Sequence, residues 1–198
     1  MNSQWQKMNS GRVADLLPSE RIGEAAQELY DPDMRPDVFI CNLCEAGFWV
    51  DAITVAACTL PAREAVWWAC VCARKMESIA GDEHEMAALQ AAETWVYKPN
   101  EENRLQAFER VKQCDAGSAG SLAASAATFN DSKLPLADGS EAEMDESVFT
   151  NMVAGAVMLS AGDAPADQIY PQMETFLESA ADIASGGDGR MPDKETES

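Results

Sequence analysis

Apolar residues recur at helical spacing through most of the chain. After Ser19, for example, Ile22, Ala25, Ala26 and Leu29 lie on one stripe, which is typical of an amphipathic helix. Similar stripes, with capping residues before them and Gly or Pro after them, predict helices over residues 20–30, 36–46, 48–59, 61–79, 82–97, 100–111, 121–129, 145–160 and 165–185. We expect Pro171 to kink or split the last one.

The fold class follows from this pattern. No run of residues alternates with period two, so no sheet is predicted. We expect an all-α domain of about eight helices in antiparallel hairpins, either a bundle or a short stack resembling helical repeats. The segment 61–79 is apolar on nearly every side, which predicts the central helix.

Three regions along the chain differ in character. Residues 1–12 and 187–198 are polar, which predicts a flexible leader and a disordered acidic tail. The single helical domain is expected over residues 13–186, with its longest polar loop at 130–144.

The chain is strongly acidic: its 198 residues hold 34 acidic side chains against 14 basic ones, a formal net charge of −20. Residues 136–198 alone hold 14 of the acids and 2 of the bases. This charge argues against nucleic acid and against anionic membranes as partners. A basic protein surface would be attracted, although the charge could equally serve solubility.

The location of the protein is inferred from two absences. No apolar run of about 20 residues occurs, so no membrane span is predicted. The first residues lack the apolar region of a secretory signal. We therefore expect a cytoplasmic protein whose six Cys stay reduced.

Cys41-Asn-Leu-Cys44 is the sharpest candidate for chemistry. Two thiolates at this spacing could share a metal or perform redox work. A zinc site would need two more ligands, and Cys70 and Cys72 would point to opposite sides of a helix. We therefore interpret the cysteines as small buried side chains, with a small structural zinc-binding protein as an alternative.

No catalytic constellation is visible. His84 is the single histidine, and it lies in an acidic helix start where we expect it to be exposed. A hydrolase with a Ser-His or Cys-His pair would depend on it, and no nucleophile motif is near. We therefore expect no enzyme activity and no cofactor.

The candidate partner-binding residues are Trp67, Trp68, Arg63 and Arg74, all in the predicted central helix. Adjacent helical residues point about 100° apart, so one tryptophan should fill the core and the other a groove or an interface. Arg63 and Arg74 are about three turns apart and share a face. They are expected to pair with neighbouring acids, or else to bind an anion or partner.

The chain resembles a known family in several blocks. These are Pro61-Ala-Arg-Glu-Ala-Val-Trp-Trp-Ala-Cys70, Ala91-Ala-Glu-Thr-Trp-Val96, Pro99, Arg104 and Val153-Ala-Gly-Ala-Val157. Over residues 12–185 the chain is similar to an uncharacterised proteobacterial family of small helical proteins often encoded among type VI secretion genes. The resemblance implies a cytosolic accessory role near secretion machinery, and it carries no catalytic residues.

These observations lead to one functional expectation and two alternatives. The expectation is a non-enzymatic adaptor or chaperone-like protein that binds a secreted effector or a basic component of the secretion apparatus. The first alternative is an acidic immunity protein that neutralises a toxin by plugging a basic site. The second is the zinc-binding protein described above.

Overall fold

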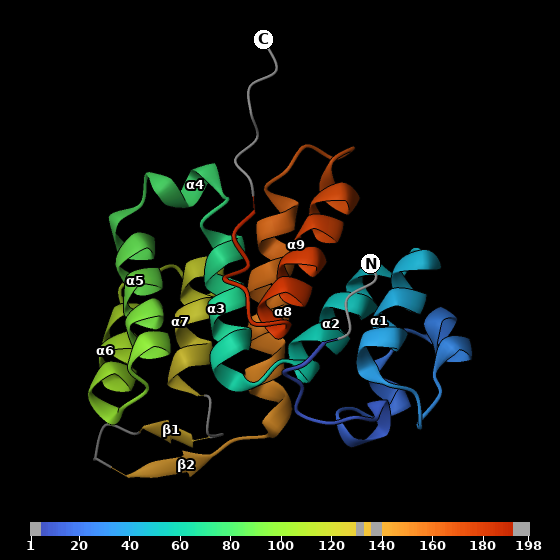
Figure 1. Cartoon of the computed structure of the whole chain (residues 1–198). Coiled ribbons are helices and arrows are strands. Elements are labelled where there is room, and N and C mark those ends of the chain that lie inside the picture. Colours follow the sequence, from blue (N-terminus) through green and yellow to red (C-terminus); the bar gives the residue numbers. More distant parts are fainter. Residues whose placement is uncertain (1–4, 130–132, 136–139, 192–198) are drawn as a thin grey trace.

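The chain folds into α-helices joined by short turns, which confirms the all-α class (Figure 1). This computed structural model describes residues 5–129, 133–135 and 140–191. Its elements, in chain order, are η1 (Val13–Asp15), η2 (Ser19–Arg21), η3 (Glu24–Leu29), α1 (Pro36–Glu45), α2 (Trp49–Thr59), α3 (Ala62–Ala73), α4 (Glu77–Ala80), α5 (Glu83–Tyr97), α6 (Glu101–Val111), α7 (Ala119–Thr128), β1 (Lys133–Pro135), β2 (Glu141–Glu143), α8 (Glu146–Gly162) and α9 (Ile169–Ala184). Among these residues, no helix is both long and apolar enough to cross a membrane.

Helix α3 lies at the centre, as predicted. It packs against α5, α7, α8 and α9, while α8 also contacts α2. Figure 1 shows α5, α6 and α7 on one side of α3, and α2 and α1 on the other. One stripe of α3, between α5 and α9, is not covered by another helix. This stripe carries the surface described below.

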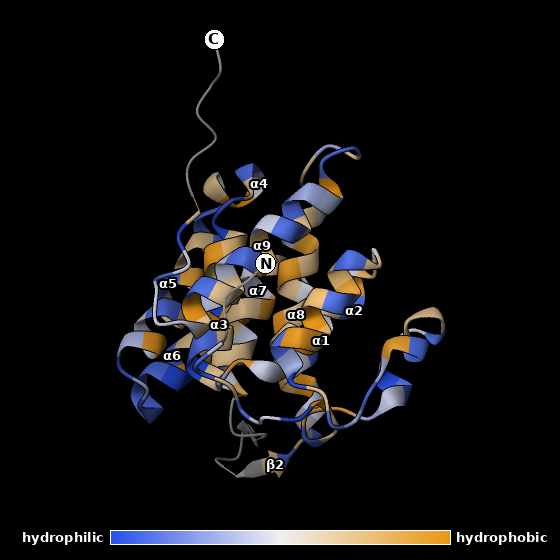
Figure 2. Cartoon of the chain, turned by 45° about the vertical axis from the view of Figure 1, so that its right-hand side comes forward, coloured by the Kyte–Doolittle hydropathy of each residue, from blue (hydrophilic) through white to orange (hydrophobic). Residues whose placement is uncertain are grey.

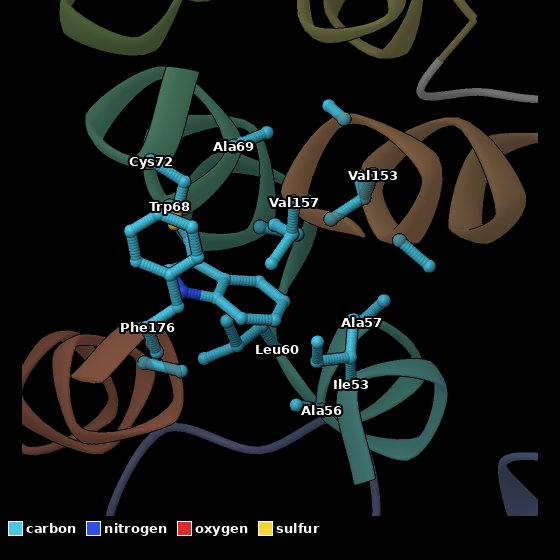
Figure 3. Close-up of a cluster of buried hydrophobic side chains, with 14 of the residues drawn as sticks. Ile53, Ala56, Ala57, Leu60, Trp68, Ala69, Cys72, Val153, Val157 and Phe176 are labelled. Carbon is cyan, nitrogen blue, oxygen red and sulfur yellow. Dashed lines mark hydrogen bonds between the residues drawn. The ribbon is translucent and has the colours of Figure 1, made fainter. Parts of the chain in front are cut away.

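The core closes around Trp68, whose side chain is 0% exposed. Figure 3 shows its ring between Leu60 from the end of α2, Val157 from α8 and Phe176 from α9. The indole N–H donates to the backbone carbonyl of Phe176 at 2.7 Å. Because its one polar atom is satisfied, the largest side chain of the core is buried without an unpaired donor.

The helix starts follow capping rules that are visible in the sequence. Asp82 accepts hydrogen bonds from the backbone N–H groups of His84 and Glu85, and Asn100 accepts one from Asn103. Asp145 does the same for Ser147 at the start of α8. These caps accept hydrogen bonds from N–H groups that the first helical turn leaves unpaired. At these three helices the predicted starts are confirmed to within a residue or two.

The predicted helix over 61–79 is wrong in its last part, because the chain leaves α3 at Arg74 and forms the separate turn α4. The cause is a carboxylate from elsewhere in the fold. Asp163, just after α8, accepts from the backbone N–H of Glu77 at 3.2 Å and from the Ser78 hydroxyl at 3.3 Å. A tertiary cap of this kind cannot be seen in local sequence.

The predicted α-helix over 20–30 is also wrong in type. The segment forms two 3-10 pieces, η2 and η3, because Ile22 adopts an extended conformation (φ −97°, ψ 139°). The N–H of Gly23 donates to the Asp51 carboxylate at 2.8 Å. That bond holds the segment against α2 instead of continuing the helix.

Proline 171 does not kink the last helix as predicted. Residues 166–168 form turns, and α9 begins only at Ile169. Pro171 therefore lies in the first turn, where the missing N–H has no helical partner to lose.

The polar loop predicted for 130–144 contains a short hairpin. β1 and β2 pair antiparallel, with Leu134 opposite Ala142. Three-residue strands are too short to produce a period-two pattern in the sequence, and they leave the all-α class unchanged.

The described part of the predicted leader lies against the helices. Trp5 is 3% exposed, and its backbone N–H donates to Asp37 at 3.2 Å. The Asn9 side chain donates to the carbonyls of Cys58 and Leu60 at 3.0 and 2.9 Å. These contacts hold the described part of the leader against the helices, whereas a flexible segment was expected. They are made by one aromatic residue and one amide, which the polar composition of the segment as a whole does not reveal.

Candidate interaction surface around Trp67

The uncovered stripe of α3 holds three of the four predicted site residues. Arg63, Trp67, Val71 and Arg74 recur at intervals of three or four, so they share one side of the helix. Trp68 lies outside this surface because its ring is fully buried in the core. The two tryptophans therefore divide as the helical geometry predicts, with Trp67 at the surface.

Trp67 is half-buried and contacted on two sides. Its indole N–H donates to the carbonyl of Asp188 at 2.7 Å. Its ring meets Tyr97 of α5 edge to face, with centroids 6.0 Å apart. Tyr97 itself is 72% exposed, so two aromatic rings stand together at the molecular surface.

Two adjoining hollows share Trp67 as a common wall. The larger, of about 380 Å³, is also lined by Val71, Arg74, Lys75, Glu93, Tyr97, Arg190 and Met191. The smaller, of about 100 Å³, is also lined by Lys7, Arg63, Glu64, Val96, Ile183 and Gly187. We refer to the two together as the Trp67 groove.

The Trp67 groove is locally basic on an acidic protein. Its lining holds five basic side chains against two acidic ones. Arg74 forms a bidentate ion pair with Glu93, with Nη2–Oε2 at 2.7 Å. The hydrogen bond to Glu93 raises the pKa of Arg74. Arg74 is thus paired with an acid, as expected.

Arg63 is held differently from the prediction. Its Nε–H donates to the carbonyl of Val96 at 3.0 Å, whereas its neighbour Glu64 pairs with Lys7 at 3.0 Å. Within the described part of the chain, Arg63 has no ion pair. Its guanidinium therefore keeps its charge available at one end of the groove.

A segment of the chain itself crosses this surface. Residues 187–191, here called the C-terminal strap, follow α9 and run beside α3 in Figure 1. Besides the bond from Trp67, the strap receives one from Lys75 Nζ to the Met191 carbonyl at 3.2 Å and one from the Ser179 hydroxyl to the Gly189 carbonyl at 2.6 Å. The N–H of Gly189 donates to Asp182 at 2.8 Å.

Sequence reasoning missed the strap and its partners. The segment was included in the predicted disordered tail because Met191 is its only large apolar residue. The remaining residues of that tail, 192–198, lie outside the described residues. The available signal was a run of glycines at 186, 187 and 189, which marks a chain that turns or approaches closely.

The cysteines of the Cys41-Asn-Leu-Cys44 motif both lie on one helix. Cys41 and Cys44 are half-buried on α1, and burial raises the pKa of Cys41 and that of Cys44, the latter to about 12. Thiolates are the form that binds metal. Within the described residues, no three His, Cys, Asp or Glu side chains are arranged to hold a metal ion.

A larger hollow, of about 760 Å³, lies between α5 and α6. Its lining consists of alanines, one leucine and long polar or charged side chains, including Ala87, Gln90, Leu105 and Arg110. Among the described residues, its lining includes no aromatic side chain. The Trp67 groove is therefore the better candidate site.

The sequence of the chain matches one family of proteins. A protein-family model described as "Family of unknown function (DUF6931)" matches residues 39–184. The match includes Arg63, Trp67 and Arg74 but ends before the C-terminal strap. No curated protein and no solved structure matches the chain.

Proposed function

Because the chain belongs to DUF6931, a family of unknown function, its role must be inferred from its own surface, and we propose that it is a non-enzymatic adaptor or chaperone-like protein. On this proposal it binds a protein partner through the Trp67 groove. The family resemblance of the sequence suggests that the partner belongs to a type VI secretion system, as a secreted effector or a component of the apparatus. The site of action would then be the cytoplasm.

One observation carries the proposal: a stretch of polypeptide already lies along the groove and forms one of its walls. The strap is held by donors from Trp67, Lys75 and Ser179 to three main-chain carbonyls. Carbonyls are common to every peptide, so these donors suit an extended segment of many sequences.

The side chains of the groove support the same interpretation. Tryptophan, tyrosine and arginine are the residues that most often dominate binding energy at protein interfaces. Here Trp67 and Tyr97 stand beside Arg74 and Arg190 in one hollow. An enzyme site would require a nucleophile or an acid–base pair, and the two carboxylates of the described lining, Glu93 and Glu64, are engaged by Arg74 and Lys7.

The proposal is tested by co-purification at low salt with the secretion proteins encoded beside this chain. We expect the wild type to recover one of them, and Trp67→Ala to recover at least about tenfold less, since removal of a buried interface tryptophan typically costs 2 kcal/mol or more. Tyr170→Ala is the matched control, because Tyr170 is 60% exposed and lies on α9 outside the groove. Equal recovery by all three proteins, or no recovery by the wild type, would contradict the proposal.

An immunity protein is the second candidate, favoured by the net charge of −20. An acidic surface speeds association with a basic toxin site. Co-expression with a neighbouring toxin separates the two functions, since rescue of growth favours immunity and improved effector solubility favours an adaptor.

A further inference from the structure

The strap contacts the rest of the chain mainly through its backbone. One of its carbonyls accepts from Trp67 of α3 and another from Lys75, just after α3, and Gly189 exchanges hydrogen bonds with Ser179 and Asp182 of α9. It is therefore bound in the manner of a short linear peptide, although it is covalently attached.

The strap is also built to be separable from α9. The helix ends at Ala184, and Gly186 follows with a φ of +97°. The N–H of Gly187 donates to the Asp182 backbone carbonyl at 2.8 Å. Beyond Gly187, the bonds between the strap and α9 involve side chains of the helix, so α9 can keep its own hydrogen bonds when residues 188–191 are released. The glycines provide the backbone freedom that release requires.

Gly189 fits its place closely. Its φ of +67° is favoured by glycine, and a Cβ there would lie 2.5 Å from Ile183 Cδ1 and 2.8 Å from Ser179 Oγ. A side chain at this position clashes with side chains of α9, and its backbone conformation is strained for any residue but glycine, so the seated strap is destabilised. A single substitution can therefore unseat the strap without shortening the chain.

Charge indicates what else fits the groove. Without Arg190, which belongs to the strap itself, the lining carries four basic and two acidic side chains. Met191 of the strap lines the larger hollow with its apolar side chain. A ligand that combines an apolar residue with neighbouring carboxylates would therefore suit this lining.

We propose that the Trp67 groove takes an extended acidic peptide segment of the partner, with an apolar residue at the Met191 position, and that the C-terminal strap competes for the same donors until it is displaced. This inference rests on the proposed function and adds the ligand chemistry and its regulation. The apparent dissociation constant of the external ligand is the intrinsic constant divided by the fraction of molecules with the strap released. Unseating the strap must then tighten external binding.

The experiment uses the full chain and a fluorescent peptide with the sequence of residues 187–198 as the external ligand, measured by fluorescence anisotropy at low salt. Gly189→Ala is expected to bind the peptide at least about tenfold more tightly than the wild type. Gly47→Ala is the matched control, because Gly47 also has a positive φ, of +83°, but faces open space at the end of α1. It should bind like the wild type.

A second peptide, with its four acids replaced by lysine, tests the charge preference. It should bind Gly189→Ala at least about tenfold more weakly than the acidic peptide, and the difference should shrink as salt is added. Equal affinity for the two peptides would overturn the acidic ligand. Equal affinity of wild type and Gly189→Ala for the acidic peptide would overturn the competing strap.

If Gly189→Ala does not fold, Asp182→Ala serves instead. It removes the acceptor of the Gly189 N–H from an exposed position on α9, and the same gain in affinity is expected. Failure of every variant to bind the peptide, while co-purification still depends on Trp67, would overturn this inference and leave the proposed function intact. Loss of that dependence would overturn the function itself.

Discussion

The adjacent tryptophans of α3 provide the most direct test of the fold. Trp68 is 0% exposed and bonded to the Phe176 carbonyl, whereas Trp67 is half-buried at the surface. Replacing Trp68 with alanine removes a complete ring from a packed core and leaves a cavity. Such changes cost about 3–5 kcal/mol of unfolding free energy.

The expected change in melting temperature follows from the size of the chain. For a domain of 150–250 residues, 1 kcal/mol corresponds to a shift of about 2–4 °C. Trp68→Ala should therefore lower Tm by about 6–20 °C. Trp68→Phe keeps most of the ring and loses the indole N–H, so about 1–2 kcal/mol is expected.

Trp67→Ala is the variant with which Trp68→Ala is compared. Because Trp67 is half-buried at the edge of the core, where it meets Tyr97 and the strap, its loss should cost less, about 1 kcal/mol. Urea unfolding followed by circular dichroism measures all three variants with one probe. If Trp67→Ala and Trp68→Ala destabilise the chain equally, the division of α3 into a core side and a groove side is incorrect.

Three further predictions concern other parts of the molecule. Glu85 is 5% exposed and accepts from the Ser118 hydroxyl and, at 2.9 Å, from the N–H of Gly120. Glu85→Ala should therefore lower the free energy of unfolding in urea by about 1–3 kcal/mol, because it leaves donors at the start of α7 unpaired. The control Glu83→Ala, at an exposed position, should change that free energy little. Burial opposes the charge of Asp37, but hydrogen bonds from Arg35 and from the Trp5 N–H outweigh it and lower the pKa of Asp37. Its contribution to stability is therefore present above the ordinary carboxyl pKa of about 4 and is lost as the pH falls through the lowered value. The difference in fluorescence between the wild type and a Trp5→Phe variant should report release of the N-terminal segment in acid but not at neutral pH. Burial raises the pKa of Cys44 to about 12, so a thiol reagent at neutral pH should label Cys44 much faster in unfolded than in folded protein. Stoichiometric zinc in the wild type that is lost in a Cys41→Ser, Cys44→Ser variant would contradict the interpretation of these cysteines as buried, unreactive side chains.

Local sequence signals predicted the helices well where the structure depends on local contacts. Pro36 at the start of α1, Asp82 before α5 and Asn100 before α6 each act within one helical turn. Prediction failed where a distant side chain decides the outcome. Asp163 accepts a hydrogen bond from the first residue of α4, and Asp51 accepts one from the N–H of Gly23, where a continuous helix was expected.

The candidate site was predictable to the same extent. Helical spacing places Arg63, Trp67 and Arg74 on one stripe of α3, and the structure brings them to one groove. The other wall could not be foreseen, because Tyr97 comes from α5 and the strap follows α9. Composition indicated disorder for the strap, yet its hydrogen bonds involve main-chain atoms that composition does not describe.

The net charge of the chain and the charge of the groove act over different distances. Within about 8 Å of the surface, which is the screening length at physiological salt, an approaching partner experiences the many acids of the chain, with its formal charge of −20. Inside the groove, apart from Arg190 of the strap, it meets four basic side chains against two acidic ones. A partner that suits both would combine a basic body with an acidic linear segment, and such a charge arrangement would orient the segment toward the groove during encounter. Added salt should then slow association first, and weaken the seated segment less, because the groove excludes part of the solvent.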